Sequence, residues 1–170
     1  PRLLPRLSHV GIDFQFSIRK KNQQVFTSGN RRKTASLICY ELVYGSKFFK
    51  AAREGAEAFF VLLNEGWYLN YPKVRSQFLQ LSVVRAVENR RGIAHSSNMG
   101  ISAFIDQRGN VLSTRCNLDP GFLKSEITMN KRITLYTAIG NYLEKLSLSV
   151  IILSIFATLI RKFLKSNQSG

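Results

Sequence analysis

The sequence predicts an α/β fold whose central sheet contains parallel strands. Two apolar runs, residues 35–40 and 56–64, suit buried strands, and the segment Tyr44–Arg53 between them has helical composition, with Gly55 placed to end the helix. A strand–helix–strand order joins parallel neighbours through a helical crossover. At 170 residues and 45% hydrophobic content, the chain is long and apolar enough to enclose a core.

A long amphipathic helix is predicted at residues 73–91, after the loop "NEGWYLNYP". Apolar residues recur there at spacings of three and four, which places them on one helical face. This face consists of Val74, Phe78, Leu81, Val84 and Val87.

The remaining strands are predicted from shorter runs. The sequence "QRGN" at 107–110 indicates a hairpin turn, and the region up to about Lys33 is expected to be rich in loops. Strands are predicted at 23–29, 92–98, 101–106, 111–114 and 122–129.

The C-terminal part of the chain is predicted to contain one transmembrane helix, at residues 142–164. Leu146–Ile160 carries no charge, but at about 1.5 Å per residue it spans roughly 22 Å, less than the ~30 Å hydrocarbon core. The longer range reaches that thickness because flanking Lys and Arg side chains can extend towards the headgroups. A buried core helix or an interfacial helix is the alternative. Basic residues at 161, 162 and 165 favour a short cytoplasmic tail at 165–170.

The charge balance favours anionic partners. The chain has 25 Lys and Arg residues against 10 Asp and Glu, a net charge of +15. The basic residues are scattered in short runs, without zinc-finger spacing, a Gly-rich phosphate loop or an aromatic RNA-binding signature. We therefore expect no nucleic-acid partner, no metal and no cofactor, and an anionic lipid surface remains compatible with the charge.

Cys39 stands where a predicted strand gives way to helical sequence, in "SLICYELVYGS". A thiol becomes a nucleophile as the thiolate, which a helix N-terminus stabilises. At such a turn the backbone amide of Tyr40 can help to bind an oxyanion, and the nearby carboxylate of Glu41 is a candidate base. A small structural residue at a strand end is the alternative, because free Cys is commonly buried.

The order of the motifs resembles one family. "LICYE" is followed by "LLNEGWY", then by "VVRAVENRRGIAHSSNMGISAFIDQRGNV" and a terminal apolar segment. This order is similar to the C-terminal part of the apolipoprotein N-acyltransferases, membrane members of the nitrilase-like carbon–nitrogen hydrolase superfamily. The resemblance extends from about Gly11 to Leu164. It implies an incomplete nitrilase-like α-β-β-α sandwich at 1–135, followed by the transmembrane helix.

The resemblance implies an enzyme with a Glu–Lys–Cys triad, in which Cys takes an acyl chain from phospholipid and passes it to the N-terminal amine of a lipid-modified cysteine on a lipoprotein. Cys39 matches the nucleophile, Glu41 an assisting acid and Tyr40 the backbone oxyanion contact. Asn64, Glu65, Gly66, Trp67 and Tyr68 match the substrate-facing loop. The implied location is the bacterial inner membrane, multi-pass in the full-length protein, with the catalytic domain on the periplasmic side.

The sequence also departs from the family. The triad Glu and Lys are expected upstream of Pro1, so the 170 residues alone are expected to be inactive. Glu65 stands where the family usually has Asp, and Phe78 where relatives often have His. Ser36 replaces a frequent Pro. These departures leave two alternatives open: a membrane-tethered nitrilase or amidase, and a degenerate non-catalytic copy.

Other polar residues have structural interpretations. Glu88 is expected to pair with an Arg and hold the fold, and His95 to be a satisfied core or surface residue. Cys116, near a hairpin strand, is interpreted as structural. Two cysteines are too few for a disulfide framework.

Overall fold

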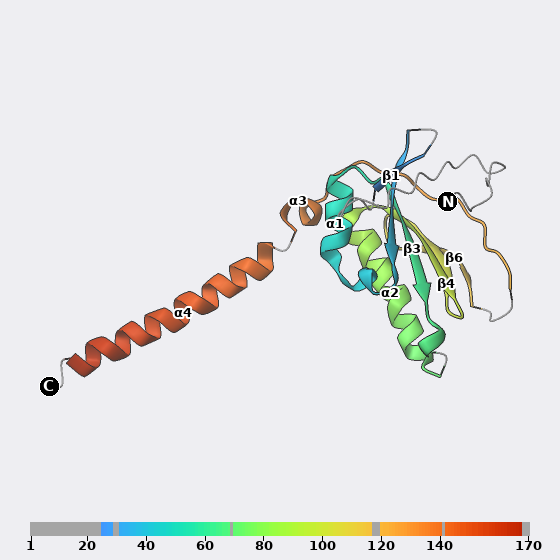
Figure 1. Cartoon of the computed structure of the whole chain (residues 1–170). Coiled ribbons are helices and arrows are strands. Elements are labelled where there is room, and N and C mark those ends of the chain that lie inside the picture. Colours follow the sequence, from blue (N-terminus) through green and yellow to red (C-terminus); the bar gives the residue numbers. More distant parts are fainter. Residues whose placement is uncertain (1–24, 29–30, 69, 117–119, 141, 168–170) are drawn as a thin grey trace, which may run out of the picture. The chain divides into compact units, whose positions relative to one another are not determined.

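The computed structural model describes residues 25–28, 31–68, 70–116, 120–140 and 142–167, with the side chains of 143 and 162–167 left out. These residues form two compact units, 1–138 and 139–170. The first unit is an α/β domain (Figure 1). Its elements are β1 (Val25–Thr27), β2 (Lys33–Ile38), the 3₁₀ turn η1 (Cys39–Val43), α1 (Gly45–Arg53), β3 (Ala58–Asn64), the 3₁₀ turn η2 (Gly66–Tyr68), α2 (Pro72–Asn89), β4 (Gly92–Asn98), β5 (Ser102–Ile105), β6 (Val111–Arg115) and α3 (Leu135–Ile139).

The six strands form one mixed sheet in the order β1-β2-β3-β4-β5-β6. β2, β3 and β4 are parallel neighbours, and α1 and α2 provide the crossovers between them, as the strand–helix–strand order predicted. β1 pairs with β2, β4 with β5 and β5 with β6, all antiparallel. The predicted "QRGN" turn is confirmed by a hairpin in which Asp106 Oδ1 accepts the N–H groups of Arg108 and Asn110 at 2.7 and 2.8 Å.

The core lies between one face of the sheet and the two helices. Alternate residues of β3, including Phe59 and Val61, point to this face and are fully buried. Phe48 of α1 meets Phe59 edge to face, with ring centroids 5.1 Å apart. On the other face Ile38 and Leu62 stay exposed. The described residues thus supply one helical layer and one sheet layer of the predicted four-layer sandwich.

Two sequence predictions about the domain were wrong. The predicted apolar face of α2 included Val84 and Val87, which are exposed, whereas the buried positions of α2 are Ser82, Arg85, Ala86 and Asn89. Counting apolar residues missed this face because its polar groups are satisfied by neighbouring elements.

The predicted strand at 122–129 has no regular structure. Single contacts hold this stretch and its continuation instead. Thr128 packs close to Gly92, and the Asn130 N–H donates to the Glu57 carbonyl at 3.0 Å. These contacts satisfy individual groups without building a ladder.

The second unit is dominated by the 26-residue helix α4 (Tyr142–Asn167). Its described apolar side chains are exposed around the helix, and three hydroxyls, those of Ser149, Ser154 and Thr158, each donate to a carbonyl four residues earlier at 2.8 Å. Within the described part of the chain, no helix combines the length and the apolar character that crossing a membrane requires. The predicted span at 142–164 is therefore unconfirmed.

Candidate active site

Cys39 is the first residue after β2 and begins η1, at the junction that the sequence predicted. Its φ of 53° lies in the left-handed region, which residues other than glycine adopt at a cost of about 1–3 kcal/mol. The residue is exposed and its thiol is free. The exposure removes the structural alternative in which Cys39 is a small buried residue. Strained strand-to-helix turns of this kind carry catalytic nucleophiles in other α/β enzymes.

The strand register brings the site segments to one edge of the sheet. Ile38 of β2 lies beside Leu62 of β3, and Asn64 of β3 lies beside Asn98 of β4. Because the three strands are parallel, their carboxyl ends meet at this edge. Cys39, the loop that starts at Asn64 and the turn after Asn98 therefore share one end of the domain, where ligands of open α/β sheets bind.

Glu41 folds back onto the end of β2. Its Oε2 accepts the N–H of Ile38 at 3.0 Å, and its Oε1 lies 3.4 Å from the Nζ of Lys47 on α1. These contacts fasten the carboxylate to the backbone that precedes Cys39. The arrangement suits a residue that shapes the turn.

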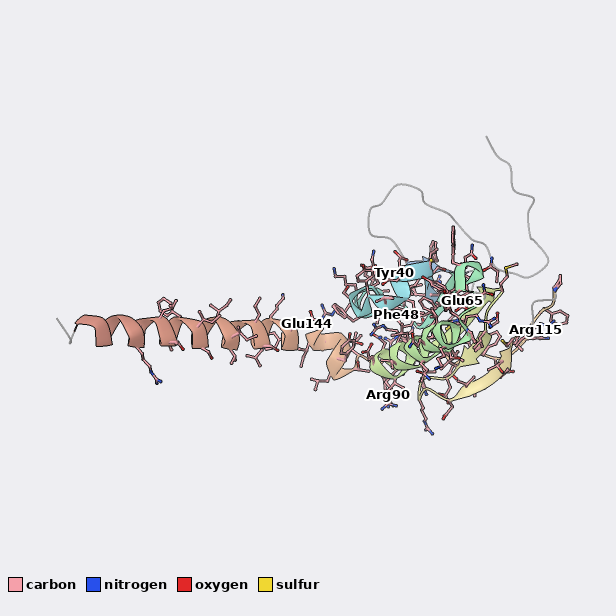
Figure 2. The ribbon with its side chains drawn as sticks, turned by 90° about the horizontal axis from the view of Figure 1, so that it is seen from below. Tyr40, Phe48, Glu65, Arg90, Arg115 and Glu144 are labelled. Atoms are coloured by element: carbon pink, nitrogen blue, oxygen red, sulfur yellow. The ribbon has the colours of Figure 1, made fainter. Side chains whose placement is uncertain are left out.

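Tyr40 lies in the first turn of η1, where backbone N–H groups precede the first intrahelical hydrogen bond. Its ring is 58% exposed and stands edge to face against the ring of Tyr44, at a centroid distance of 6.1 Å. The amide of Tyr40 follows Cys39 directly in the chain, and both aromatic residues are exposed; Figure 2 labels Tyr40.

Arg85 on α2 holds the other end of η1. Its Nε donates to the Leu42 carbonyl at 3.2 Å, and its Nη2 donates to the Val43 carbonyl at 2.6 Å. Its Nη1 lies 2.7 Å from Glu88 Oε2, which confirms the predicted structural pairing of Glu88 with an Arg. The chain passes Arg85 closely at Gly45, where a Cβ would lie 2.5 Å from the Tyr136 hydroxyl and 2.9 Å from Arg85 Nη1. Sequence reasoning missed this role, although the "RAVE" spacing signalled the ion pair.

The loop after β3 presents an aromatic surface. Trp67 is 83% exposed, and the ring of Tyr68 packs 5.8 Å from that of Phe78 on α2. Asn64 Oδ1 accepts the Gly66 N–H at 3.2 Å. Phe78, the departure from the family pattern, thus supports this loop from below.

Glu65 differs from its exposed neighbours Asn64 and Trp67 because it is buried. Figure 2 labels it within the α/β domain. Its Oε2 accepts the N–H of Ile101 at 3.3 Å. Burial raises the pKa of the Glu65 carboxyl, against the hydrogen bonds of Ser97 and Ile101 and the charge of Arg75. The prediction that Glu65 faces substrate does not agree with this placement.

Other candidate groups lie away from the thiol. Lys33 is at the opposite end of β2, six residues before Cys39 and therefore about 20 Å away at roughly 3.3 Å per residue, so it cannot serve as the oxyanion lysine. His95 is buried with its Nδ1 2.7 Å from the hydroxyl of Ser82, and burial lowers its pKa to about 4. It is a neutral core residue, as one of the two predicted interpretations has it, but only Nδ1 is satisfied, because Nε2 is buried without a hydrogen-bond partner among the described residues.

Cys116 is exposed and free, just after β6. Among the described residues, no group of three or more His, Cys, Asp or Glu side chains could hold a metal ion.

The structure is that of an α/β domain with a cysteine on a strained turn at the carboxyl end of a parallel strand. The chain is related in sequence to the apolipoprotein N-acyltransferases. It is 31% identical over 147 residues to apolipoprotein N-acyltransferase 1 of Treponema denticola, covering 82% of the chain and 26% of that protein. It is 31% identical over 140 residues to the enzyme of Chlorobaculum tepidum, covering 79% and 26%. The chain spans about a quarter of the length of these relatives.

Solved structures with partial similarity come from the nitrilase superfamily. An amidase from Nesterenkonia matches with a TM-score of 0.45 and 22% identity, over 63% of this chain and 40% of that one. Nit3 of Saccharomyces cerevisiae matches with a TM-score of 0.45 and 21% identity, over 58% and 38%. No family model matches the chain.

Proposed function

We propose that this chain carries the nucleophile of an apolipoprotein N-acyltransferase, with Cys39 as the residue that bears the acyl group. The observation that carries the proposal is the exposed thiol of Cys39 on a strained turn, beside an aromatic loop, in a chain related to these enzymes. In the first step the thiolate attacks the ester carbonyl of a phospholipid. The tetrahedral oxyanion collapses, the lysophospholipid leaves as the alcohol after protonation, and a thioester remains on Cys39.

In the second step the N-terminal amine of a lipid-modified cysteine on a lipoprotein attacks the thioester. The carbon–nitrogen bond forms, the Cys39 thiolate leaves, and the amine loses a proton. The amide of Tyr40 helps to bind the oxyanion in both steps. Glu41 assists by holding the turn through the Ile38 N–H. Glu41 is placed in this supporting role, and neither the general base nor the oxyanion lysine is assigned to a described residue.

The aromatic loop supplies the substrate-facing surface. Trp67 and Tyr68 follow β3, and Tyr40 and Tyr44 follow β2, so aromatic side chains lie after the carboxyl ends of two neighbouring parallel strands. Aromatic rings of this kind can cover an acyl chain and still meet a polar headgroup. Phospholipid as donor and lipoprotein as acceptor are the partners that fit this surface and the sequence relationship.

We further propose that α4 is associated with the bilayer of the bacterial inner membrane, as a transmembrane helix, and that the α/β domain faces the periplasmic side in a multi-pass protein. Two observations support this. Apolar side chains such as Val150, Ile152 and Phe156 are more than half exposed, and the hydroxyls of Ser149 and Ser154 are satisfied by carbonyls of the helix itself. Polar groups satisfied in this way tolerate lipid.

The acyl-transfer proposal is tested on the full-length protein with phospholipid carrying a labelled acyl chain. We expect a hydroxylamine-sensitive label on the protein that is lost in Cys39→Ala and kept in Cys116→Ala. Cys116 is the matched control because both thiols are free and exposed. A label that survives Cys39→Ala would refute the nucleophile assignment. Absence of any label would favour a non-catalytic copy, and turnover of small amides without acylation by lipid would favour an amidase.

The membrane proposal has a separate test. Flotation with vesicles is measured on a peptide of residues 139–170, since other membrane segments would hold a multi-pass protein in the bilayer whatever α4 contacts. The wild-type peptide should float, and Ile152→Asp with Phe156→Asp should weaken its flotation, because burying a carboxylate in lipid is costly. Protease protection of the segment after Arg161 distinguishes a spanning helix from an interfacial one. Unchanged flotation in the double variant would count against a lipid contact of α4.

A further inference from the structure

Glu65 is bonded to the turn after β4 through both its backbone and its side chain. Its N–H donates to Asn98 Oδ1 at 3.2 Å, and its Oε2 accepts the N–H of Ile101 at 3.3 Å. The other carboxyl oxygen, Oε1, is buried without a hydrogen-bond partner among the described residues. Glu65 is 1% exposed, so these bonds form away from bulk water. One residue of the loop after β3 therefore fastens that loop to the turn at 97–101.

Gly100 leaves the space that the Glu65 carboxyl occupies. A Cβ added at residue 100 would overlap Glu65 Oε2 and Ser97 Oγ, and it would lie 2.5 Å from Glu65 Cδ. Any side chain at position 100 must therefore displace the carboxyl. Glutamate, which is longer than the aspartate usual in the family, therefore fits at position 65 only because residue 100 has no side chain.

Further contacts pass the constraint on to the exposed part of the loop. The N–H of Tyr68 donates to the Glu65 carbonyl at 2.9 Å, which closes the turn that contains Trp67. Arg75 Nη1 donates to the Met99 carbonyl at 3.3 Å and so braces the turn from α2. A Cβ at Gly66 would lie 3.4 Å from Met99 Sδ, so the loop and the turn are in close contact there.

We propose that Glu65 is a positioning residue of the acyl-transfer site. Its side chain fixes the Trp67 loop by accepting the N–H of Ile101 from the turn at 97–101, in a space that only glycine at position 100 leaves open. The proposal rests on the proposed function for its effect on catalysis. Glu65 acts by its shape and its acceptor oxygens and transfers no proton.

This role separates two substitutions that remove the acid. Glu65→Gln keeps the length of the side chain and an oxygen that can accept the Ile101 N–H, whereas Glu65→Ala removes both. In the full-length protein we expect Cys39 acylation by labelled phospholipid to slow about tenfold or more in Glu65→Ala and to stay within about threefold of wild type in Glu65→Gln. The reason is that leaving the Ile101 N–H without its buried acceptor costs about tenfold or more. The pH profile of Glu65→Gln should keep its shape. Glu54→Ala, at an exposed glutamate after α1, is the matched control and should leave the rate unchanged.

The steric dependence has its own test. Gly100→Ala should slow acylation, and adding Glu65→Asp should restore part of the rate, because the shorter acid withdraws its carboxyl by about 1.5 Å, one carbon–carbon bond. Hydrogen–deuterium exchange of the segment around Ile101 measures directly how firmly Glu65 holds the turn at 97–101, and it needs no substrate. Exchange there should be about tenfold faster than in the wild-type protein in Glu65→Ala and in Gly100→Ala. In the variant that combines Gly100→Ala with Glu65→Asp, it should be slower than in Gly100→Ala alone.

Three results would overturn the proposal. If the Glu65→Gln protein acylated Cys39 as slowly as the Glu65→Ala protein, and its pH profile lost one limb, Glu65 would be a proton-transfer group. If the effects of Gly100→Ala and Glu65→Asp were purely additive, positions 65 and 100 would not depend on each other sterically. If exchange at Ile101 were unchanged in Glu65→Ala, Glu65 would not hold the turn at 97–101. If the wild-type protein formed no acyl-enzyme, the proposed function would fail. The exchange measurements would still show whether Glu65 holds the turn at 97–101.

Discussion

Replacing Arg85 by Met tests whether α2 holds the turn that carries Cys39. The guanidinium is the group that satisfies the Leu42 and Val43 carbonyls at the end of η1, and it also pairs with Glu88. Met keeps most of the apolar stem and removes all of the donors. The substitution should therefore destabilise the domain and, in addition, displace Cys39 from its strained conformation.

The magnitude follows from the burial of these groups. Arg85 is 9% exposed, so the two carbonyls lose their partner in a place that water reaches poorly. Hydrogen bonds from a charged donor contribute about 1.5–3 kcal/mol each, and removing one partner of a buried ion pair costs about 3–5 kcal/mol. Glu88 is partly exposed and recovers some hydration. We expect a loss of about 3–4 kcal/mol in the free energy of unfolding.

Denaturant unfolding of the wild-type protein and of Arg85→Met measures this loss. The rate at which labelled phospholipid acylates Cys39 shows whether the turn keeps its geometry. Arg108→Met is the control, because Arg108 is exposed in the β5–β6 turn and its substitution should change the free energy by less than about 0.5 kcal/mol. Adding Glu88→Leu to Arg85→Met should restore part of the stability, since it removes the unpaired carboxylate. A loss no larger than that of Arg108→Met would refute the reasoning about stability. A large loss with an unchanged acylation rate would refute the link to Cys39.

Two further predictions concern strain and acid sensitivity. Cys39→Gly should be more stable to thermal unfolding than Cys39→Ala by about 1 kcal/mol, because glycine adopts a φ of 53° without the steric cost that Ala retains; equal stabilities would show that the turn relaxes without this strain. The free energy of unfolding should fall as the pH drops from about 6.5 to about 4, because the buried His95, with its pKa lowered to about 4, resists a proton that the unfolded chain accepts. The loss reaches at most roughly 3 kcal/mol, and a His95→Gln variant with the same acid sensitivity would contradict this origin.

Local sequence patterns predicted most of the sheet. The apolar runs that became β2, β3 and β4 are recognisable because both faces of a parallel strand are usually covered, which selects continuous hydrophobic residues. The position of Cys39 at a strand end followed from the same pattern. The strand itself ends one residue earlier, at Ile38, and Cys39 already belongs to η1.

The contacts of α2 could not be predicted in this way. Its buried residues include Ser82, Arg85 and Asn89, each of which is bonded to another part of the chain: His95, the carbonyls of η1 and Thr137. Hydrophobic periodicity counts apolar side chains and assigns such polar residues to the solvent. Their burial is favourable only because distant partners satisfy them.

Local sequence patterns were enough to establish the α/β class, the parallel crossovers and the placement of the Cys39 thiol at a strand end, because each depends on residues close together in the chain. The tertiary structure decided that Arg85 holds the Cys39 turn and that Glu65 lies under the loop in the space left by Gly100. It also decided that residues 122–129 form no strand. These features depend on which groups from different elements meet, and a hydrogen bond or a steric fit between such groups exists only after the chain has folded.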